Sequence, residues 1–349
     1  MSSAAQVTVT PLPAEGILPA DATLALAIDR ICARPHRIFL VRSGADRRAV
    51  PERDLRAAWH DHAPRDTRVW ELARAQLVAP GLEAARSALA DQESLDSMVA
   101  VGASNHPTCV SRELISPKIA IVMAGGLGTR LRPLTDNLPK PLLPIGGEPL
   151  LGRILKHLQR HGVLRVFLSV HYLAEKVRHF VGDGSRFELE VEYLEEKQPL
   201  GTGAGLALMP RVDGPFLVVN GDVLTNVNLS ALGRCHALDK NLVTVATCLL
   251  PTQLKYGVVH SDGDRIVGIE EKPTLLHPMN AGIYAFAPEI LDRVQQGVPL
   301  PMVPFVNTLI EKGERVGRFA LVEYWNDIGA HADYESAQAE IGRLFPANA

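Results

Sequence analysis

The residues best suited to chemistry lie between positions 118 and 149, which read KIAIVMAGGLGTRLRPLTDNLPKPLLPIGGEP. Within this stretch, Ala124–Gly128 is rich in glycine, so its backbone can adopt conformations closed to other residues and its N–H groups can approach a polyanion closely. Arg130 and Arg132 follow at once, and Lys140 comes after a proline-bounded loop. Three cations beside a bare backbone predict a binding site for a chain of phosphates.

Two common phosphate-loop patterns do not fit this glycine segment. The pattern G-x-x-x-x-G-K-[ST] needs a Lys-Ser or Lys-Thr pair after the glycines, and none follows. The pattern G-x-G-x-x-G fails because Leu131 stands where the third glycine is required. The segment therefore belongs to neither of these classes of nucleotide-binding loop.

A carboxylate follows an apolar run later in the chain. Phe216–Val219 is apolar throughout, and Asn220-Gly221-Asp222 comes directly after it. If the run is a strand of a parallel sheet, Asp222 lies at the C-terminal edge of that sheet, where open α/β sheets bind their ligands. Aspartate oxygens suit Mg²⁺, which usually binds through one or two carboxylates together with substrate phosphates.

The complete run G-G-x-G-T-R-L-x-P-L-T-x-x-x-P-K-P-L-L-P resembles the signature of the sugar-1-phosphate nucleotidyltransferases, and the resemblance covers about Lys118 to Ile341. It implies a GT-A-like nucleotidyltransferase of the mannose-1-phosphate guanylyltransferase type. The nucleotide-binding residues that it implies in this run are Ala124, Gly125, Gly126, Gly128, Thr129 and Arg130.

The reaction implied by the resemblance is a single displacement, in which a phosphate oxygen of a sugar 1-phosphate attacks the α-phosphorus of a nucleoside triphosphate. Such chemistry depends on positioning and charge stabilisation rather than on a protein nucleophile. Arg130 would hold the departing phosphates and Lys140 would contact the α-phosphate. Tyr324–Gly329 resembles the W-x-D-[IV]-G element of the family, so Asp327 would join Asp222 in holding Mg²⁺.

Two further segments match parts of the family that face the sugar phosphate. They are Glu270-Glu271-Lys272-Pro273 and Asn280-Ala281-Gly282-Ile283-Tyr284, and both fall in an excursion that we expect to form a sugar-binding lobe. Lys272 would neutralise the phosphate of the sugar. The sugar-binding residues that the resemblance implies are Glu270, Glu271, Lys272, Asn280 and Gly282.

The base is expected to meet residues 194–205, which resemble the family's base-contacting loop and include Gly201 and Thr202. Uridylyl and thymidylyl relatives tend to carry Gln five positions before the glycine, where this chain has Glu196. An ionised carboxylate only accepts hydrogen bonds, and guanine presents two adjacent donors on one edge. We therefore favour GTP over UTP, while Gln198 stands close enough to take the same place if the loop shifts.

The elements that position these residues alternate between strand and helix. Apolar runs predict strands at 119–123, 165–170, 189–193 and 216–219, and helical spacing predicts helices at 149–158, 174–181 and 332–344. This alternation indicates a Rossmann-like, doubly wound α/β domain with a mostly parallel sheet. We expect this nucleotidyltransferase domain to span residues 115–349, after a linker at 105–117.

The first part of the chain is expected to be a smaller α/β domain. After a flexible start at 1–13, a helix, two strands and a helix over residues 22–59 resemble one CBS motif, the adenosine-nucleotide-sensing module, and a second motif would fall within 67–114. Asp54 matches the family's ribose-binding carboxylate. Pro51, however, replaces the usual Thr or Ser, so we expect a degenerate CBS-like domain at 14–114, kept for dimer packing or as a cover.

Composition limits the partners. The chain has 349 residues, 46% apolar content and a net charge of −3, which indicates an ordinary globular protein with no nucleic-acid partner. The start carries no basic residues followed by an apolar run, and no stretch is long and apolar enough for a membrane span. Four scattered cysteines predict buried thiols rather than a disulfide framework, so we expect a cytoplasmic protein that forms a homo-oligomer.

The family resemblance leaves several functions open. The favoured enzyme is a guanylyltransferase for an amino-sugar or heptose 1-phosphate, used in surface glycan biosynthesis. A mannose-1-phosphate guanylyltransferase and a UTP-dependent uridylyltransferase are the alternatives within the enzyme class. A regulatory subunit that binds nucleotide sugars without turnover, or a scaffold gated by an adenosine nucleotide, is the alternative outside it.

Overall fold

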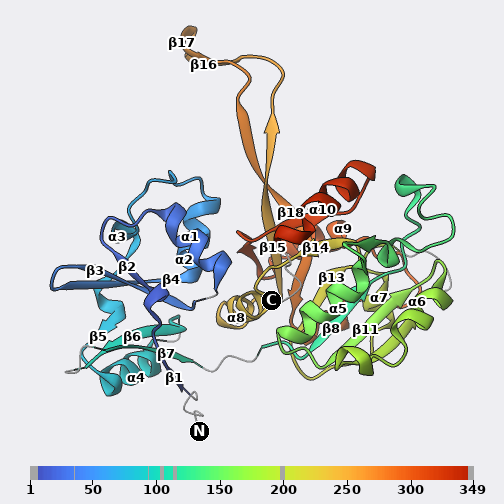
Figure 1. The fold of residues 1–349 in the computed structure, drawn as a ribbon, viewed down its shortest axis with the longest axis horizontal. Helices are drawn as coiled ribbons and strands as arrows, with labels where there is room; N and C mark the ends of the chain where they lie inside the picture. The colour runs from blue at the N-terminus through green and yellow to red at the C-terminus, as the bar shows by residue number, and fades with distance from the viewer. Residues whose placement is uncertain are drawn as a thin grey trace.

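The computed structural model describes residues 7–34, 36–92, 94–102, 106–112, 116–196 and 201–344, which form two α/β domains (Figure 1). The N-terminal domain is drawn in blue and cyan, and the C-terminal domain runs from green to red. A long two-stranded arm projects from the C-terminal domain.

A seven-stranded sheet forms the centre of the C-terminal domain, with strand order β12-β11-β8-β13-β18-β15-β19. Its strands are β8 (Ile119–Met123), β11 (Arg165–Val170), β12 (Glu190–Glu195), β13 (Phe216–Asn220), β15 (Val243–Gln253), β18 (Thr274–Phe286) and β19 (Val316–Ala320). Within this sheet only β18 runs antiparallel to its neighbours. The expected mostly parallel sheet is confirmed.

Two apolar layers cover the two faces of this sheet because successive side chains of each buried strand point to opposite faces. Ala120 and Val122 of β8 pack in one core cluster, while Ile121 packs in the other. The helices of the first layer are α5 (Leu150–Arg160), α6 (Ala174–Val181), α8 (Leu229–Leu238) and α10 (His331–Leu344). Those of the second are α7 (Ala204–Leu208) and α9 (Met302–Glu311). The domain is therefore doubly wound.

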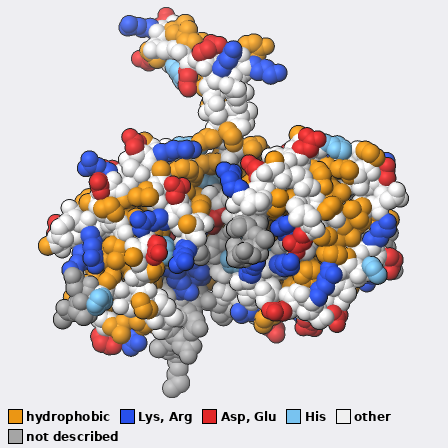
Figure 2. All heavy atoms as spheres, viewed as in Figure 1, with side chains coloured by type: hydrophobic (Ala, Val, Ile, Leu, Met, Phe, Trp, Pro, Cys, Tyr) orange, Lys and Arg blue, Asp and Glu red, His pale blue; other side chains and the backbone are white. Residues whose placement is uncertain are grey.

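The arm consists of the outer ends of β15 and β18, with the hairpin of β16 (Val258–Asp262) and β17 (Arg265–Glu270) at its tip. The inner half of β18 is buried, whereas Thr274–Asn280 is exposed throughout. Apolar and charged side chains lie together on the arm (Figure 2). Its large exposed apolar side chains are Leu250, Tyr256, Val259, Ile266, Val267, Ile269, Leu275, Leu276 and Met279.

The N-terminal domain contains two small sheets. The first has the order β2-β3-β4, from β2 (Ile17–Pro19), β3 (Ile38–Ser43) and β4 (Asp46–Pro51), and carries α1 (Leu24–Ala33) and α2 (Glu52–His60). The second has the order β1-β7-β6-β5, from β1 (Val7–Pro11), β5 (Val78–Ala79), β6 (Ser97–Val101) and β7 (Pro107–Arg112), and carries α4 (Leu82–Asp91). The short helix α3 (Val69–Leu72) follows α2 along the chain, and its Val69 packs in the apolar core of the first sheet.

This arrangement repeats a strand–helix–strand–strand unit. β2, α1, β3 and β4 form the first copy, and β5, α4, β6 and β7 form the second. The repeat agrees with the expected pair of related motifs, although the CBS-like identity of the domain stays a prediction. The carboxylate of Asp54, expected to bind ribose, pairs with Arg74 and with Arg53, so a ligand there would compete with two ion pairs.

Two expectations for the ends of this domain are wrong. Val7–Pro11, expected within a flexible start, forms β1 and pairs antiparallel with β7. Pro107–Arg112, expected within the linker, is β7 itself and lies between β1 and β6. Val7–Thr10 alternates apolar and polar β-branched residues, which is typical of a strand, and the pairing of the two segments supplies the hydrogen bonds that order both.

The described helices and the cysteines bear on two expectations, that the chain has no membrane span and that its cysteines are buried thiols. Within those residues no helix combines the length and the apolar character needed to cross a bilayer. All four cysteines are free thiols. Cys109 and Cys248 are buried as expected, whereas Cys32 is exposed and Cys235 is half-buried.

Two histidines of the C-terminal domain lie with their rings 4.7 Å apart, between α5 and α8. Nε2 of His157 donates to the carbonyl oxygen of Val227 at 2.9 Å, and Nδ1 of His161 is 3.2 Å from Oγ of Ser230. Burial and the neighbouring ring lower the pKa of His157 to about 3, and burial lowers the pKa of His161 to about 4. Both rings are therefore neutral in the folded protein at pH 7.

We expect the free energy of unfolding to fall as the pH drops below about 6.5, because these histidines then bind protons in the unfolded chain but not in the folded one. The loss is about 1.4 kcal/mol per pH unit for each histidine, until its folded pKa is reached. His157→Gln keeps a donor for Val227 and should reduce the pH dependence of the unfolding free energy by about 1.4 kcal/mol per pH unit, the contribution of one proton. Urea unfolding at pH 7, 6 and 5 measures it. His179→Gln, at an exposed position of α6, should leave the slope unchanged.

Candidate active site

A cavity of about 420 Å³ opens at the C-terminal ends of β8 and β13. Ten residues expected at the site line it: Gly125, Gly126, Gly128, Thr129, Arg130, Lys140, Glu196, Gly201, Thr202 and Asp222. The glycine segment, Arg130, Lys140 and the first carboxylate therefore share one space, as the parallel sheet predicts, whereas Arg132 does not line it.

The glycine segment has its shape because of one residue. Gly128 has φ +63°, and a Cβ added there would lie 3.0 Å from Cγ2 of Thr135 and 3.1 Å from Cβ of Lys140. Thr135 Oγ1 donates to the carbonyl oxygen of Gly128 at 2.8 Å and holds the turn. Only glycine suits that position.

Ala124, expected to bind the nucleotide, does not line the cavity. It is buried, and its N–H donates to the carbonyl oxygen of Ser169 at 2.8 Å. Its backbone therefore connects β8 to β11 and has no donor left for a phosphate.

The two expected metal ligands, Asp222 and Asp327, approach the same lysine side chain. Lys140 Nζ lies 2.6 Å from Oδ2 of Asp222 and 3.9 Å from Oδ1 of Asp327. They approach because β14 (Val223–Thr225) pairs antiparallel with β20 (Trp325–Asp327), which places Val223 opposite Asp327.

Close backbone packing fixes Asp222. The N–H of Gly221 donates to the carbonyl oxygen of Met123 at 2.9 Å, and the N–H of Ile328 donates to the carbonyl oxygen of Asp222. A Cβ at Gly221 would lie only 2.6 Å from that oxygen of Met123. Glycine before the aspartate therefore lets β13 turn tightly against the end of β8.

The acidic pair fits a divalent cation. Oδ1 of Asp327 is buried and has no hydrogen-bond partner in the structure. Burial and the nearby Asp222 raise the pKa of Asp327, while Lys140 and Arg130 oppose that shift. Within the described residues no group of three His, Cys, Asp or Glu side chains could hold a metal ion. Two carboxylates without a third suit Mg²⁺ that also binds substrate phosphates.

Glu196 is anchored at the far side of the cavity. Its Oε1 accepts a hydrogen bond from Oγ of Ser169 at 2.5 Å, and its backbone oxygen lies 2.7 Å from Nδ1 of His171. A Cβ on Gly125 would come within 3.3 Å of the same Oε1, so the carboxylate lies against the glycine segment. Gln198, the alternative base reader, lies outside the described residues.

Gly201 and Thr202 close the same side through contacts with the start of α9. Gly201 has φ +98°, and a Cβ there would lie 3.0 Å from the backbone nitrogen of Pro301. The hydroxyl of Thr202 accepts from the N–H of Met302 at 3.0 Å. These contacts hold the part of the cavity wall formed by Gly201 and Thr202 against the start of α9.

The residues expected at the sugar are split between two places. Glu270, Glu271 and Lys272 are exposed on the arm, and none of them lines the cavity. Asn280 is exposed at the base of the arm, where its Nδ2 donates to Oη of Tyr284 at 2.7 Å and its Oδ1 accepts from the N–H of Gly282. The structure thus separates the charged sugar residues from the cavity.

Four lining residues were not expected: Met123, Leu127, Asn220 and Gly329. Asn220 immediately precedes the predicted metal ligand motif, so its position at the end of an apolar run could have indicated it. A Cβ on Gly282 would lie 2.6 Å from Nδ2 of Asn220, which places Gly282 directly behind this wall. A Cβ on Gly329 would lie 3.5 Å from Nη2 of Arg130.

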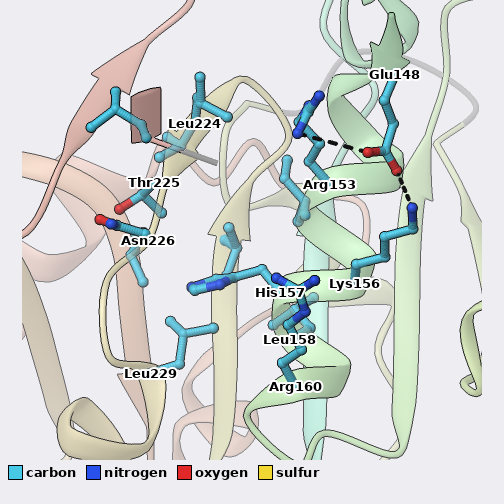
Figure 3. Close-up of a pocket in the computed structure, with 15 residues that line it drawn as sticks. Glu148, Arg153, Lys156, His157, Leu158, Arg160, Leu224, Thr225, Asn226 and Leu229 are labelled. Carbon is cyan, nitrogen blue, oxygen red and sulfur yellow. Dashed lines mark ion pairs between the residues drawn. The ribbon is translucent and has the colours of Figure 1, made fainter. Parts of the chain in front are cut away.

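A second cavity, of about 340 Å³, lies beside α5, β14 and α8 (Figure 3). Glu148 lies at its edge and pairs with Lys156 at 2.7 Å and with Arg153 at 3.7 Å. None of the residues expected at the active site lines it. It is therefore separate from the site described above.

Residues 119–343 match the family model described as nucleotidyl transferase. Over 236 residues the chain is 35% identical to a mannose-1-phosphate guanylyltransferase of Mycobacterium tuberculosis, with 64% of each chain covered. Over 239 residues it is 31% identical to a UTP–glucose-1-phosphate uridylyltransferase of Synechocystis sp., with 62% of each covered. The match thus spans less than two thirds of the length of either relative.

Solved structures share the fold. One from Bacillus anthracis, assigned as a glucose-1-phosphate thymidylyltransferase, superposes with a TM-score of 0.53 at 22% identity and covers 63% of this chain and 94% of its own. HddC from Yersinia pseudotuberculosis, complexed with GMP-PN, superposes with a TM-score of 0.50 at 24% identity and covers 64% and 99%.

Proposed function

Because the chain belongs to the nucleotidyl transferase family over residues 119–343, we propose that it transfers a nucleoside monophosphate from a nucleoside triphosphate to a sugar 1-phosphate. The observation that carries this proposal is the meeting of Asp222 and Asp327 at Lys140, in the cavity that the glycine segment lines. This arrangement supports the proposal because it places a glycine-rich backbone, suited to phosphates, beside two carboxylates, suited to a divalent cation.

In the proposed reaction a phosphate oxygen of the sugar 1-phosphate forms a bond to the α-phosphorus, and the bond from that phosphorus to the β-phosphate oxygen breaks. The products are a nucleotide sugar and pyrophosphate. The N–H groups of Gly125–Thr129 and the guanidinium of Arg130 bind the departing phosphates, and Lys140 stabilises negative charge at the α-phosphate. Asp222 and Asp327 would hold Mg²⁺, which supplies further positive charge when bound.

We propose GTP as the triphosphate and an amino-sugar or heptose 1-phosphate as the acceptor, in the supply of precursors for surface glycans. A mannose-1-phosphate or UTP-dependent reaction is the alternative, and relatives with each of these activities support keeping both. A matrix of five triphosphates against several sugar 1-phosphates, scored by pyrophosphate release, tests the proposal. Binding of nucleotide sugars with no pyrophosphate from any pair would instead favour a regulatory subunit.

The carboxylate of Glu196 supports the choice of GTP, since it can accept hydrogen bonds from guanine but would repel the acceptors of uracil. We expect Glu196→Gln to lower the ratio of kcat/KM for GTP to that for UTP by about tenfold or more, because one of the two adjacent guanine donors loses its acceptor. Competition assays with the two triphosphates measure this ratio. Glu195→Gln is the matched control, because Glu195 is exposed and does not line the cavity. An unchanged ratio in Glu196→Gln would contradict the role of this carboxylate.

Lys272 bears on the sugar-binding lobe. We expect Lys272→Ala to raise KM for the sugar 1-phosphate about tenfold or more, because a hydrogen bond between charged groups is lost, while KM for the triphosphate stays unchanged. Lys255→Ala alters another exposed lysine of the same arm and should leave both constants unchanged. Since Lys272 lies outside the cavity, the expected result also requires the arm to approach a bound sugar phosphate. An unchanged KM in Lys272→Ala would remove this residue from the sugar site.

A further inference from the structure

The segment that leads from β19 to Asp327 is held by the N-terminal domain. Arg56 of α2 is 1% exposed. Its Nη1 and Nη2 donate to the two carboxylate oxygens of Glu323 at 2.7 and 2.6 Å, in a bidentate pair. Nε and Nη2 also donate to Oε1 of Glu52 at 2.9 and 2.6 Å. One guanidinium thus joins a carboxylate from each domain.

Three consecutive backbone carbonyls of the same segment also accept hydrogen bonds from the N-terminal domain. Arg56 donates to the oxygen of Ala320 at 3.3 Å, Nε2 of His60 donates to that of Leu321 at 3.0 Å, and Sγ of Cys32 donates to that of Val322 at 3.4 Å. The side chain of Val322 packs on the apolar core of the N-terminal domain. The segment is therefore fixed at both its backbone and its side chains.

The guanidinium of Arg56 lies between two buried carboxylates, and the positive charge of Arg234 also acts on Glu52. Burial opposes ionisation of Glu323, but the hydrogen bonds from Arg56 prevail and lower its pKa. Removing Arg56 would leave the buried Glu323 without the cation with which it is paired, which a low-dielectric interior does not tolerate. Glu323 would then move towards water or take up a proton, and the segment would lose its anchor.

A short route connects this cluster to the metal ligands. Oε1 of Glu323 accepts from the N–H of Asn228, and the next carbonyl oxygen, that of Tyr324, accepts from Oγ1 of Thr225 at 2.7 Å. Thr225 belongs to β14, which begins just after Asp222, and β20 with Asp327 is its partner. Glu323 is thus linked, through the adjacent Tyr324 and its hydrogen bond from Thr225, to the strand pair that brings the two aspartates together.

We propose that Arg56 is a positioning residue of the transferase site, through which the N-terminal domain holds Asp327 in place and sets the affinity of the site for its divalent cation. This inference rests on the proposed function for the role of the cation. The geometry behind it, a hydrogen-bonded path from Arg56 to Asp327, is independent of which triphosphate or sugar the enzyme uses.

The test measures Mn²⁺ binding to the full chain by electron paramagnetic resonance, without turnover. We expect Arg56→Met to raise the Kd for Mn²⁺ about tenfold, with Arg56→Lys between it and the native chain. Hydrogen exchange at the N–H of Ile328, which donates to Asp222, should become faster in parallel. Arg318→Ala is the matched control, because its 2.8 Å pair with Asp61 also joins the domains but is exposed and does not include Glu323.

Glu323→Gln is a milder second variant in case Arg56→Met does not fold, because it preserves the size of the side chain and one acceptor for Arg56. We expect it to weaken Mn²⁺ binding as well. Native Mn²⁺ affinity and native exchange at Ile328 in folded Arg56→Met or Glu323→Gln would overturn the proposal, even with a lower Tm. Failure of all these variants to fold would assign the cluster to stability alone and would also overturn it. If the native chain turns over no substrate pair, the proposed function fails, while the Mn²⁺ measurement still decides the role of Arg56.

Discussion

Asp222→Asn should reduce turnover by about 10³-fold or more, because the change removes one of the two carboxylates placed to bind the divalent cation and so much of the charge stabilisation of the reaction. Loss of the charge also removes the 2.6 Å ion pair with Lys140, which would then be paired only with the more distant Asp327. Pyrophosphate release and Mn²⁺ binding measure the two effects, and both should fall together.

A control for this variant lies beyond the other end of the same strand. Asp213 is exposed, just before the N-terminal end of β13 and therefore at the opposite edge of the sheet from Asp222. Asp213→Asn changes the net charge equally and should keep native turnover. Native activity in Asp222→Asn, measured beside this control, would remove Asp222 from the metal site.

Lys140→Met should lower kcat by about 10²- to 10³-fold, because the cation that stabilises charge at the α-phosphate is lost. Lys140 is 8% exposed and lies between the two aspartates. Without it their repulsion is no longer offset, so the site should bind a divalent cation at least as tightly as before. Turnover should therefore fall while Mn²⁺ affinity, measured on the same preparation, stays the same or rises.

Lys118→Met is the matched control for this second variant. Lys118 is exposed and directly precedes β8, at the opposite end of the strand from the glycine segment. It should leave both turnover and Mn²⁺ binding unchanged. If Lys140→Met loses Mn²⁺ binding together with turnover, the role of Lys140 is to hold the aspartates in place, and its assignment to the α-phosphate is wrong.

The proposed role of Arg56 would make the active site depend on the N-terminal domain. The N-terminal domain contributes hydrogen bonds from Arg56, His60 and Cys32 to the segment that leads to Asp327, the proposed metal ligand. A bound molecule or a partner that moves α2 would therefore reach the site through Glu323. This gives the CBS-like prediction a physical test, since an adenosine nucleotide that binds the N-terminal domain should change Mn²⁺ affinity only while Arg56 is present.

Much of the C-terminal domain could be predicted from the sequence alone. The apolar runs of β8, β11 and β13 have no polar alternation because both faces of each strand are buried, so their pattern carries the fold class. The glycine segment and its cations form one continuous stretch, and Asp222 immediately follows a strand. Local order and the geometry of parallel sheets were enough to bring these residues to one edge.

Contacts between distant parts of the chain were decided only by the tertiary structure. The Arg56–Glu323 pair joins residues 267 positions apart, and no spacing or motif in either neighbourhood indicates its partner. The strand β1 resembled a frayed start because its order comes from β7, about a hundred residues later. The arm carries Glu270–Lys272 away from the cavity because β15 and β18 extend beyond the sheet. Residue types determined which groups were available for chemistry, and long-range packing, which leaves no local pattern, determined which of them meet.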